Sequence, residues 1–148
     1  MKRNDIIILI VILSYFILPQ TGYEWNGSLW GHFIYPVCHA NIFHLLANCF
    51  VVWLLKNPIY HSTWLIAILC SFLPCFAEQP TFGLSGVIFA HIGITWAKYG
   101  TFKDMCIRVL PLTLITGLLP NVNMMIHIYC LFAAYFFTLL INIKRYAK

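Results

Sequence analysis

Ser85 lies between two glycines in the stretch GLSG, residues 83–86, where a loop gives way to an apolar run. A hydroxyl on such an open backbone can serve as a nucleophile, or it can be a small residue that lets two helices pack closely. His127 follows much later, near the start of the last apolar run. If the two side chains meet, His127 can take the proton of Ser85 as a general base, and the pair can hydrolyse a peptide bond.

A second polar pair lies in the stretch HLLAN, residues 44–48. His44 and Asn48 are four positions apart, so a helix places them on one face. Both can donate to an oxyanion, the charge that develops when a serine attacks a carbonyl. No Asp or Glu occupies the outer half of any expected helix, which favours a Ser-His dyad over a Ser-His-Asp triad.

The composition indicates which elements must position these four side chains. Of the 148 residues, 61% are hydrophobic and 9% are charged, which leaves too little polar surface for a soluble globule. We expect an all-α membrane protein with a single domain over residues 1–148, because about six spans of roughly 20 residues use most of the chain. The apolar runs and the turn residues between them predict six helices, near residues 5–19, 42–56, 62–77, 84–98, 105–119 and 124–143.

The nine basic residues predict how this bundle sits in a membrane. They lie at the two ends of the chain or around the connections that follow the second and fourth expected helices, and the other three connections contain none. Because basic residues mark cytoplasmic loops, both termini are expected in the cytoplasm. The serine, the two histidines and the asparagine then share one outer layer, and such costly intramembrane groups usually mark a functional site. The same bias accounts for the net charge of +5 without a nucleic-acid partner.

The remaining cysteines and histidines give no pattern of a metal site. The six cysteines show no CxxC pair, and most lie within apolar runs, which favours a packing role. Cys38, in an expected loop, could be a thiolate nucleophile, but a free loop cysteine is favoured. We expect His32 and His61 to be interfacial loop residues and His91 to serve in packing or in a local hydrogen bond. No metal ion or other cofactor is expected.

GLSG at 83–86, HLLAN at 44–48 and a histidine in the last of six expected helices together resemble the rhomboid family of intramembrane serine proteases. The resemblance extends from about residue 30 to the sixth expected helix. It implies a six-transmembrane-helix rhomboid-like bundle with Ser85 as the nucleophile and His127 as the base. It also implies an oxyanion hole formed by the amide of Ser85 and the side chains of His44 and Asn48.

The resemblance assigns supporting roles to three further residues. Gly83 would keep the approach to the nucleophile open. His39 matches a histidine that the family often has five residues before the position of His44. Phe89 falls where the family commonly has a tyrosine that stacks on the catalytic histidine, so the ring is kept here and the hydroxyl is lost.

The chain departs from the family pattern in two places. The family's outer loop usually carries a Trp-Arg pair, whereas here Trp25 and Trp30 are followed by Asn and Gly. This loop, which we expect in the outer interface, must therefore be bonded differently. In the sixth helix the family tends to place glycines after the histidine. Cys130 and Ala134 stand in this region instead, and they are small enough to let the fourth and sixth helices approach.

The sequence thus predicts an intramembrane serine protease that hydrolyses peptide bonds in or near the transmembrane segments of membrane-protein substrates, close to the outer face. Its expected partners are those substrates and membrane lipids, and its expected location is the inner membrane of a bacterium. The alternative is a catalytically inactive rhomboid-like protein that binds transmembrane segments without cutting them. A small transporter or channel ranks last, because the inner halves of the expected helices contain almost no polar residues to line a path.

Overall fold

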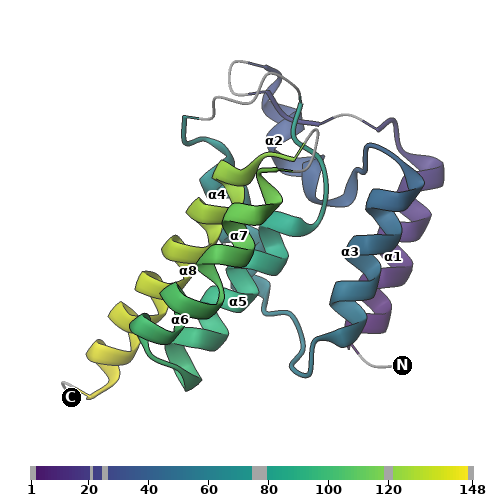
Figure 1. Ribbon diagram of the computed structural model, residues 1–148. Helices are drawn as coiled ribbons and strands as arrows, with labels where there is room; N and C mark the ends of the chain where they lie inside the picture. The colour runs from purple at the N-terminus through teal and green to yellow at the C-terminus, as the bar shows by residue number, and fades with distance from the viewer. Residues whose placement is uncertain (1–2, 21, 25–26, 75–79, 119–121, 147–148) are drawn as a thin grey trace.

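The computed structural model describes residues 3–20, 22–24, 27–74, 80–118 and 122–146. The chain is helical, and within these ranges extended segments pair only at an isolated antiparallel bridge between Tyr23 and Thr81. The elements, labelled in Figure 1, are α1 (Arg3–Ile17), α2 (Leu29–Ile34), η1 (Tyr35–Val37), α3 (Ile42–Leu54), α4 (His61–Ser71), α5 (Ser85–Tyr99), α6 (Phe102–Arg108), α7 (Leu110–Thr116) and α8 (Met124–Tyr146).

Helices occupy all six regions in which the sequence predicts them, but most are short. α1 and α5 have 15 residues, and α4 has 11; at 1.5 Å per residue, 15 residues cover only about 22 Å. Among the described residues, the stretch Met124–Asn142 is long and apolar enough to cross a membrane by itself. Leu29–Val37 and Ile42–Leu54, which meet at a bend of 66°, would provide a second span if counted together. The all-helical fold is therefore confirmed, and the count of six spans stays a prediction.

The helix predicted over 105–119 is present as two shorter helices, with the interruption close to Pro111. α6 and α7 meet at Val109. Pro111 lies in the first turn of α7, where its missing amide proton is tolerated, but it removes one bond of a continuous helical ladder. The ladder resumes where the amide of Thr113 donates to the carbonyl of Val109 at 2.9 Å.

The helices run back and forth between two ends of the molecule. α1 and α3 pack side by side, and α5 and α8 share the most extensive contact in a second group that includes α4. In Figure 1 the beginning of α1, the end of α8 and the connections α3–α4 and α5–α6 lie at the lower end. α2 and η1 lie at the upper end, as do the beginnings of α5 and α8.

Large apolar side chains cover much of the outer surface of the helices. Phe16, Phe43, Trp53, Leu118 and Leu140 are each at least 61% exposed. Water-soluble monomers rarely expose so much apolar surface, whereas a bilayer covers it without cost. The surface therefore matches the membrane environment that the composition predicts.

Candidate active site

Ser85 is the first residue of α5 and follows a loop that needs glycine at position 83. Gly83 has a φ of +101°, a left-handed conformation that favours glycine. Its amide donates to the carbonyl of Tyr35 at 2.9 Å. A Cβ atom at Gly83 would lie 2.7 Å from His44 Nε2 and 3.2 Å from Asn48 Nδ2. The absence of a side chain thus lets α3 bring two polar groups close to the beginning of α5.

His127 Nε2 lies 2.9 Å from Ser85 Oγ, which is hydrogen-bonding distance. Phe89, one turn after Ser85 on α5, stacks on the imidazole with ring centroids 4.4 Å apart and an interplanar angle of 18°. The side chain of His127 is 4% exposed. The imidazole is therefore held between an aromatic face and a hydroxyl, in the geometry that a general base requires.

A glycine of α5, Gly93, allows α5 and α8 to approach closely, and a second one, Gly86, leaves room for Tyr35 of η1. Gly86 and Gly93 are seven positions apart and share one face of α5. A Cβ at Gly93 would collide with the carbonyl of Leu131 and lie 3.0 Å from the Cβ of Ala134. A Cβ at Gly86 would lie 2.8 Å from the hydroxyl of Tyr35 and in ordinary contact, at 3.5 Å, with the sulfur of Cys130. Small residues on both helices thus bring the serine and the histidine within reach.

The beginning of α8 is tied to the loop before Ser85. Asn123 Oδ1 accepts from two amides in the first turn of α8, at 3.1 and 3.4 Å, as a capping asparagine does. Its Nδ2 donates to Thr81 Oγ1 at 2.7 Å. The backbone of Thr81 pairs with that of Tyr23 through bonds of 2.8 and 3.0 Å. These bonds fix the position of His127 relative to Ser85.

α3 presents His44 and Asn48 one turn apart. Asn41 caps this helix, because its side chain accepts the amide of His44 at 2.9 Å. Asn48 Nδ2 donates to the carbonyl of His44 at 3.0 Å. A side-chain amide carries two protons, so this bond uses one of the two that Asn48 can donate.

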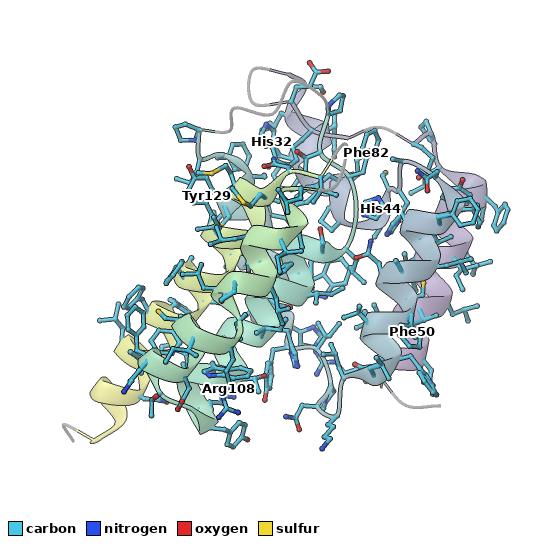
Figure 2. All side chains as sticks on the ribbon, viewed as in Figure 1. His32, His44, Phe50, Phe82, Arg108 and Tyr129 are labelled. Atoms are coloured by element: carbon cyan, nitrogen blue, oxygen red, sulfur yellow. The ribbon has the colours of Figure 1, made fainter. Side chains whose placement is uncertain are left out.

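A cavity of about 320 Å³ lies between α3, α5, α7 and α8, within the range of about 300–1,000 Å³ that is typical of ligand sites. It is lined by all four polar residues that the sequence singled out, namely Ser85, His127, His44 and Asn48. Phe82 forms part of its apolar lining, and Figure 2 shows Phe82 close to His44 where the loop before α5 faces α3. The structure therefore gathers residues from three helices in one cavity.

His39 lies beside this cavity rather than in it. Its side chain is fully buried, and its ring meets that of His44 at 67° with centroids 5.2 Å apart. Burial lowers the pKa of His39 to about 4, and the neighbouring His44 is the second cause. His39 is therefore neutral near pH 7 and supports His44 by packing. Cys38 lies in the connection between η1 and α3, as expected of a loop cysteine, and it is buried there with its thiol donating to the carbonyl of Pro19 at 3.8 Å.

The outer loop is held by His32, and the prediction that His32 is an interfacial residue is wrong. His32 is 3% exposed, and its ring stacks on Phe72 with centroids 4.2 Å apart. Its Nδ1 lies 2.9 Å from Ser71 Oγ. These contacts attach α2 to the end of α4 in a chain that lacks the Trp-Arg pair. Trp30 is 74% exposed, and Trp25 lies outside the described residues.

Sequence reasoning did not find Thr116, the last residue of α7. Its Oγ1 lies 3.0 Å from His127 Nδ1, on the side of the imidazole away from Ser85. The signal was a polar residue near the outer end of the fifth expected helix, at the depth already inferred for His127. A threonine hydroxyl in an apolar run commonly bonds to its own helix, so its residue type alone does not indicate a second partner.

The helical bundle and its Ser-His pair resemble the rhomboid family, and the comparisons with known proteins agree with this resemblance. Residues 26–144 match the family model of the rhomboid domain. The match covers most of the sequence, and the chain belongs to the rhomboid family. A curated relative from Acanthamoeba polyphaga mimivirus, named "Putative rhomboid protein", is 27% identical over 130 residues, which cover 78% of this chain and 76% of the relative. Membership of this family implies a membrane protein.

Proposed function

We propose that this protein is an intramembrane serine protease that uses Ser85 and His127 as a catalytic dyad. The contact of 2.9 Å between Ser85 Oγ and His127 Nε2 carries the proposal, because it joins a nucleophile to a base. Membership of the rhomboid family supports it. The substrates are peptide bonds in or near the transmembrane segments of other membrane proteins.

In the first half of the reaction, Ser85 Oγ attacks the carbonyl carbon of the scissile bond while its proton passes to His127 Nε2. The tetrahedral intermediate carries a negative charge on the former carbonyl oxygen. When it collapses, the C–N bond breaks, His127 returns the proton to the leaving nitrogen, and an ester to Ser85 remains. Water then attacks this ester with His127 again as the base, which releases the acid and restores the serine.

Three donors are available for the oxyanion. Ser85 begins α5, so its amide has no partner one turn earlier within the helix. The positive end of the α5 dipole adds to the attraction for a negative charge. His44 and Asn48 line the same cavity from α3. We assign all three to the oxyanion, and Phe89, Gly83 and His39 to support of the dyad and of these donors.

For the orientation in the membrane, we propose a single domain with six spans and both termini in the cytoplasm. All nine basic residues belong to the chain ends or to the α3–α4 and α5–α6 regions. In Figure 1 the beginning of α1, the end of α8 and these two connections lie at one end of the molecule. The cavity with Ser85 lies toward the opposite end, which is the outer side by the positive-inside bias. Because the curated relative is viral, a bacterial inner membrane stays a prediction.

The proposal is tested with a charged fluorophosphonate that does not cross membranes and reacts with activated serines. We expect it to label the protein in intact cells, because the proposed orientation places Ser85 on the outer side and His127 activates it. The purified protein in lipid vesicles is expected to cleave a reporter that contains a transmembrane segment.

Each other outcome of this experiment has a definite meaning. Labelling only after the cells are permeabilised would contradict the proposed orientation, but it would still support Ser85 as the nucleophile. An unlabelled protein that binds the reporter without cutting it would instead favour the alternative function, recognition of transmembrane segments by an inactive rhomboid.

We predict that Asn48→Ala and His44→Ala each slow catalysis on the order of 100-fold to 1000-fold, the usual cost of one oxyanion donor. The loss is expected in kcat more than in KM, because the oxyanion exists only near the transition state. Each loss is partial because two donors remain. The measurement is turnover of the reporter in vesicles, together with the thermal stability of each variant.

Asn4→Ala is a matched control for the asparagine variant. Asn4 Oδ1 accepts the amide of Ile59 at 3.0 Å, and its side chain joins α1 to the end of α3 without lining the cavity. We expect this control to lower stability and to leave turnover of the folded protein near normal. If Asn48→Ala behaves like the control, its role is structural and Asn48 does not serve the oxyanion.

A further inference from the structure

Thr116 makes two hydrogen bonds, and together they define the protonation of His127. Thr116 Oγ1 donates to the carbonyl of Thr113 at 2.6 Å and lies 3.0 Å from His127 Nδ1. A threonine hydroxyl has one proton and two acceptor lone pairs, and a carbonyl oxygen can only accept. The proton of Thr116 is therefore committed to Thr113, and Thr116 can meet the imidazole only as an acceptor. It follows that Nδ1 of His127 carries the proton of the neutral ring.

This tautomer is the one that general-base catalysis needs. A neutral imidazole has one donor nitrogen and one acceptor nitrogen. With the proton on Nδ1, Nε2 is the acceptor, and Ser85 Oγ lies 2.9 Å from it. In the opposite tautomer Nε2 would donate to Ser85 and could not take its proton. We propose that Thr116 is a positioning residue that holds His127 in the Nδ1-protonated tautomer, an inference that rests on the proposed protease function.

A neutral acceptor also suits the surroundings of the dyad. His127 is 4% exposed, and a carboxylate placed beside it would have to lose its own hydration. A hydroxyl avoids this cost, and it still accepts from Nδ1–H after Nε2 has gained the proton of the serine. α7 thereby supplies an orienting group in a chain with no acidic residue in the outer halves of its expected helices.

The alternative is that Thr116 only completes the last turn of α7. Threonines in helices often bond to a carbonyl three or four residues earlier. In this chain Thr113 bonds to the carbonyl of Val109 at 2.9 Å, and Thr138 bonds to that of Ala134 at 2.8 Å. Thr116 differs from them by its second contact, which reaches a ring on another helix. The two readings predict different effects of the same substitution.

The first experiment compares Thr116→Val, which keeps the shape and removes the acceptor, with Thr116→Ser, which keeps the hydroxyl. Thr138→Val is the matched control, because it removes a buried hydroxyl that bonds within its own helix. We expect Thr116→Val to lower kcat by at least about 10-fold with little change in KM. The decrease is expected to stay below the loss on the order of 10⁴-fold that follows when a catalytic histidine is held in the wrong tautomer. Thr116→Ser is expected to restore most of the rate, and Thr138→Val to stay near the wild-type kcat.

The second experiment observes the tautomer directly, in full-length protein with ¹⁵N-labelled histidine. The ring signals of His127 are identified by their loss in His127→Ala. In the wild type we expect the Nδ1-protonated form, and in Thr116→Val a shift toward the Nε2-protonated form. A wild-type ring protonated on Nε2, or a Thr116→Val variant with normal kcat and unchanged ring signals, overturns the inference. An inactive, unlabelled wild type would refute the protease proposal instead, and the ring signals would still decide the role of Thr116.

Discussion

Replacing Ser85 with alanine is expected to lower peptide-bond cleavage by on the order of 10⁴-fold to 10⁶-fold, as the loss of a catalytic serine does elsewhere. In the proposed mechanism the hydroxyl supplies the attacking atom, and its Oγ lies 2.9 Å from His127 Nε2. The fold is expected to persist, because the change removes one small atom from the edge of a cavity. The measurement is turnover of the transmembrane reporter, together with fluorophosphonate labelling.

The matched control is Ser62→Ala, which removes a serine of α4 that does not line the cavity. This variant is expected to cleave and to be labelled like the wild type. Substantial turnover by purified Ser85→Ala would remove Ser85 from the nucleophile role. Loss of turnover together with loss of folding would leave the labelling of the wild type as the decisive measurement, with the modified residue located by mass spectrometry.

His127→Ala is expected to lower cleavage on a similar scale, and the double variant with Ser85→Ala is expected to be hardly slower than either single variant. Members of one catalytic unit are not additive, because removal of either disables the same step. His127 also stacks on Phe89 with centroids 4.4 Å apart. Some loss of thermal stability should therefore accompany the substitution, as for other large-to-small changes at buried sites.

His91→Ala separates this packing effect from catalysis. His91 is also a buried histidine, 2% exposed, and it stacks on Tyr60 with centroids 5.4 Å apart. We expect it to lose stability while the folded protein keeps near-normal turnover. If the losses from Ser85→Ala and His127→Ala instead multiply in the double variant, the two residues act independently and the dyad is wrong.

The helical bundle and the set of polar residues that lie together in it could be predicted from the sequence. Apolar runs are local features, so the helical regions were found, with ends that differ by a few residues. A polar group is costly inside a membrane, and its depth follows from its place along a helix. Depth and sidedness were therefore sufficient to group Ser85, His127, His44 and Asn48, which line one cavity.

Tertiary structure decided how these residues face one another, because depth along a helix does not define rotation about its axis. Rotation depends on packing between distant segments, such as the approach of α8 to Gly93 of α5. The contact of Thr116 with His127 and the burial of His32 arise in the same way, since each needs a partner on another helix. The amino-acid sequence by itself determined the helices, the layer and the candidate chemistry, whereas packing between helices decided the distances, the orientation of the His127 ring and its contact with Thr116.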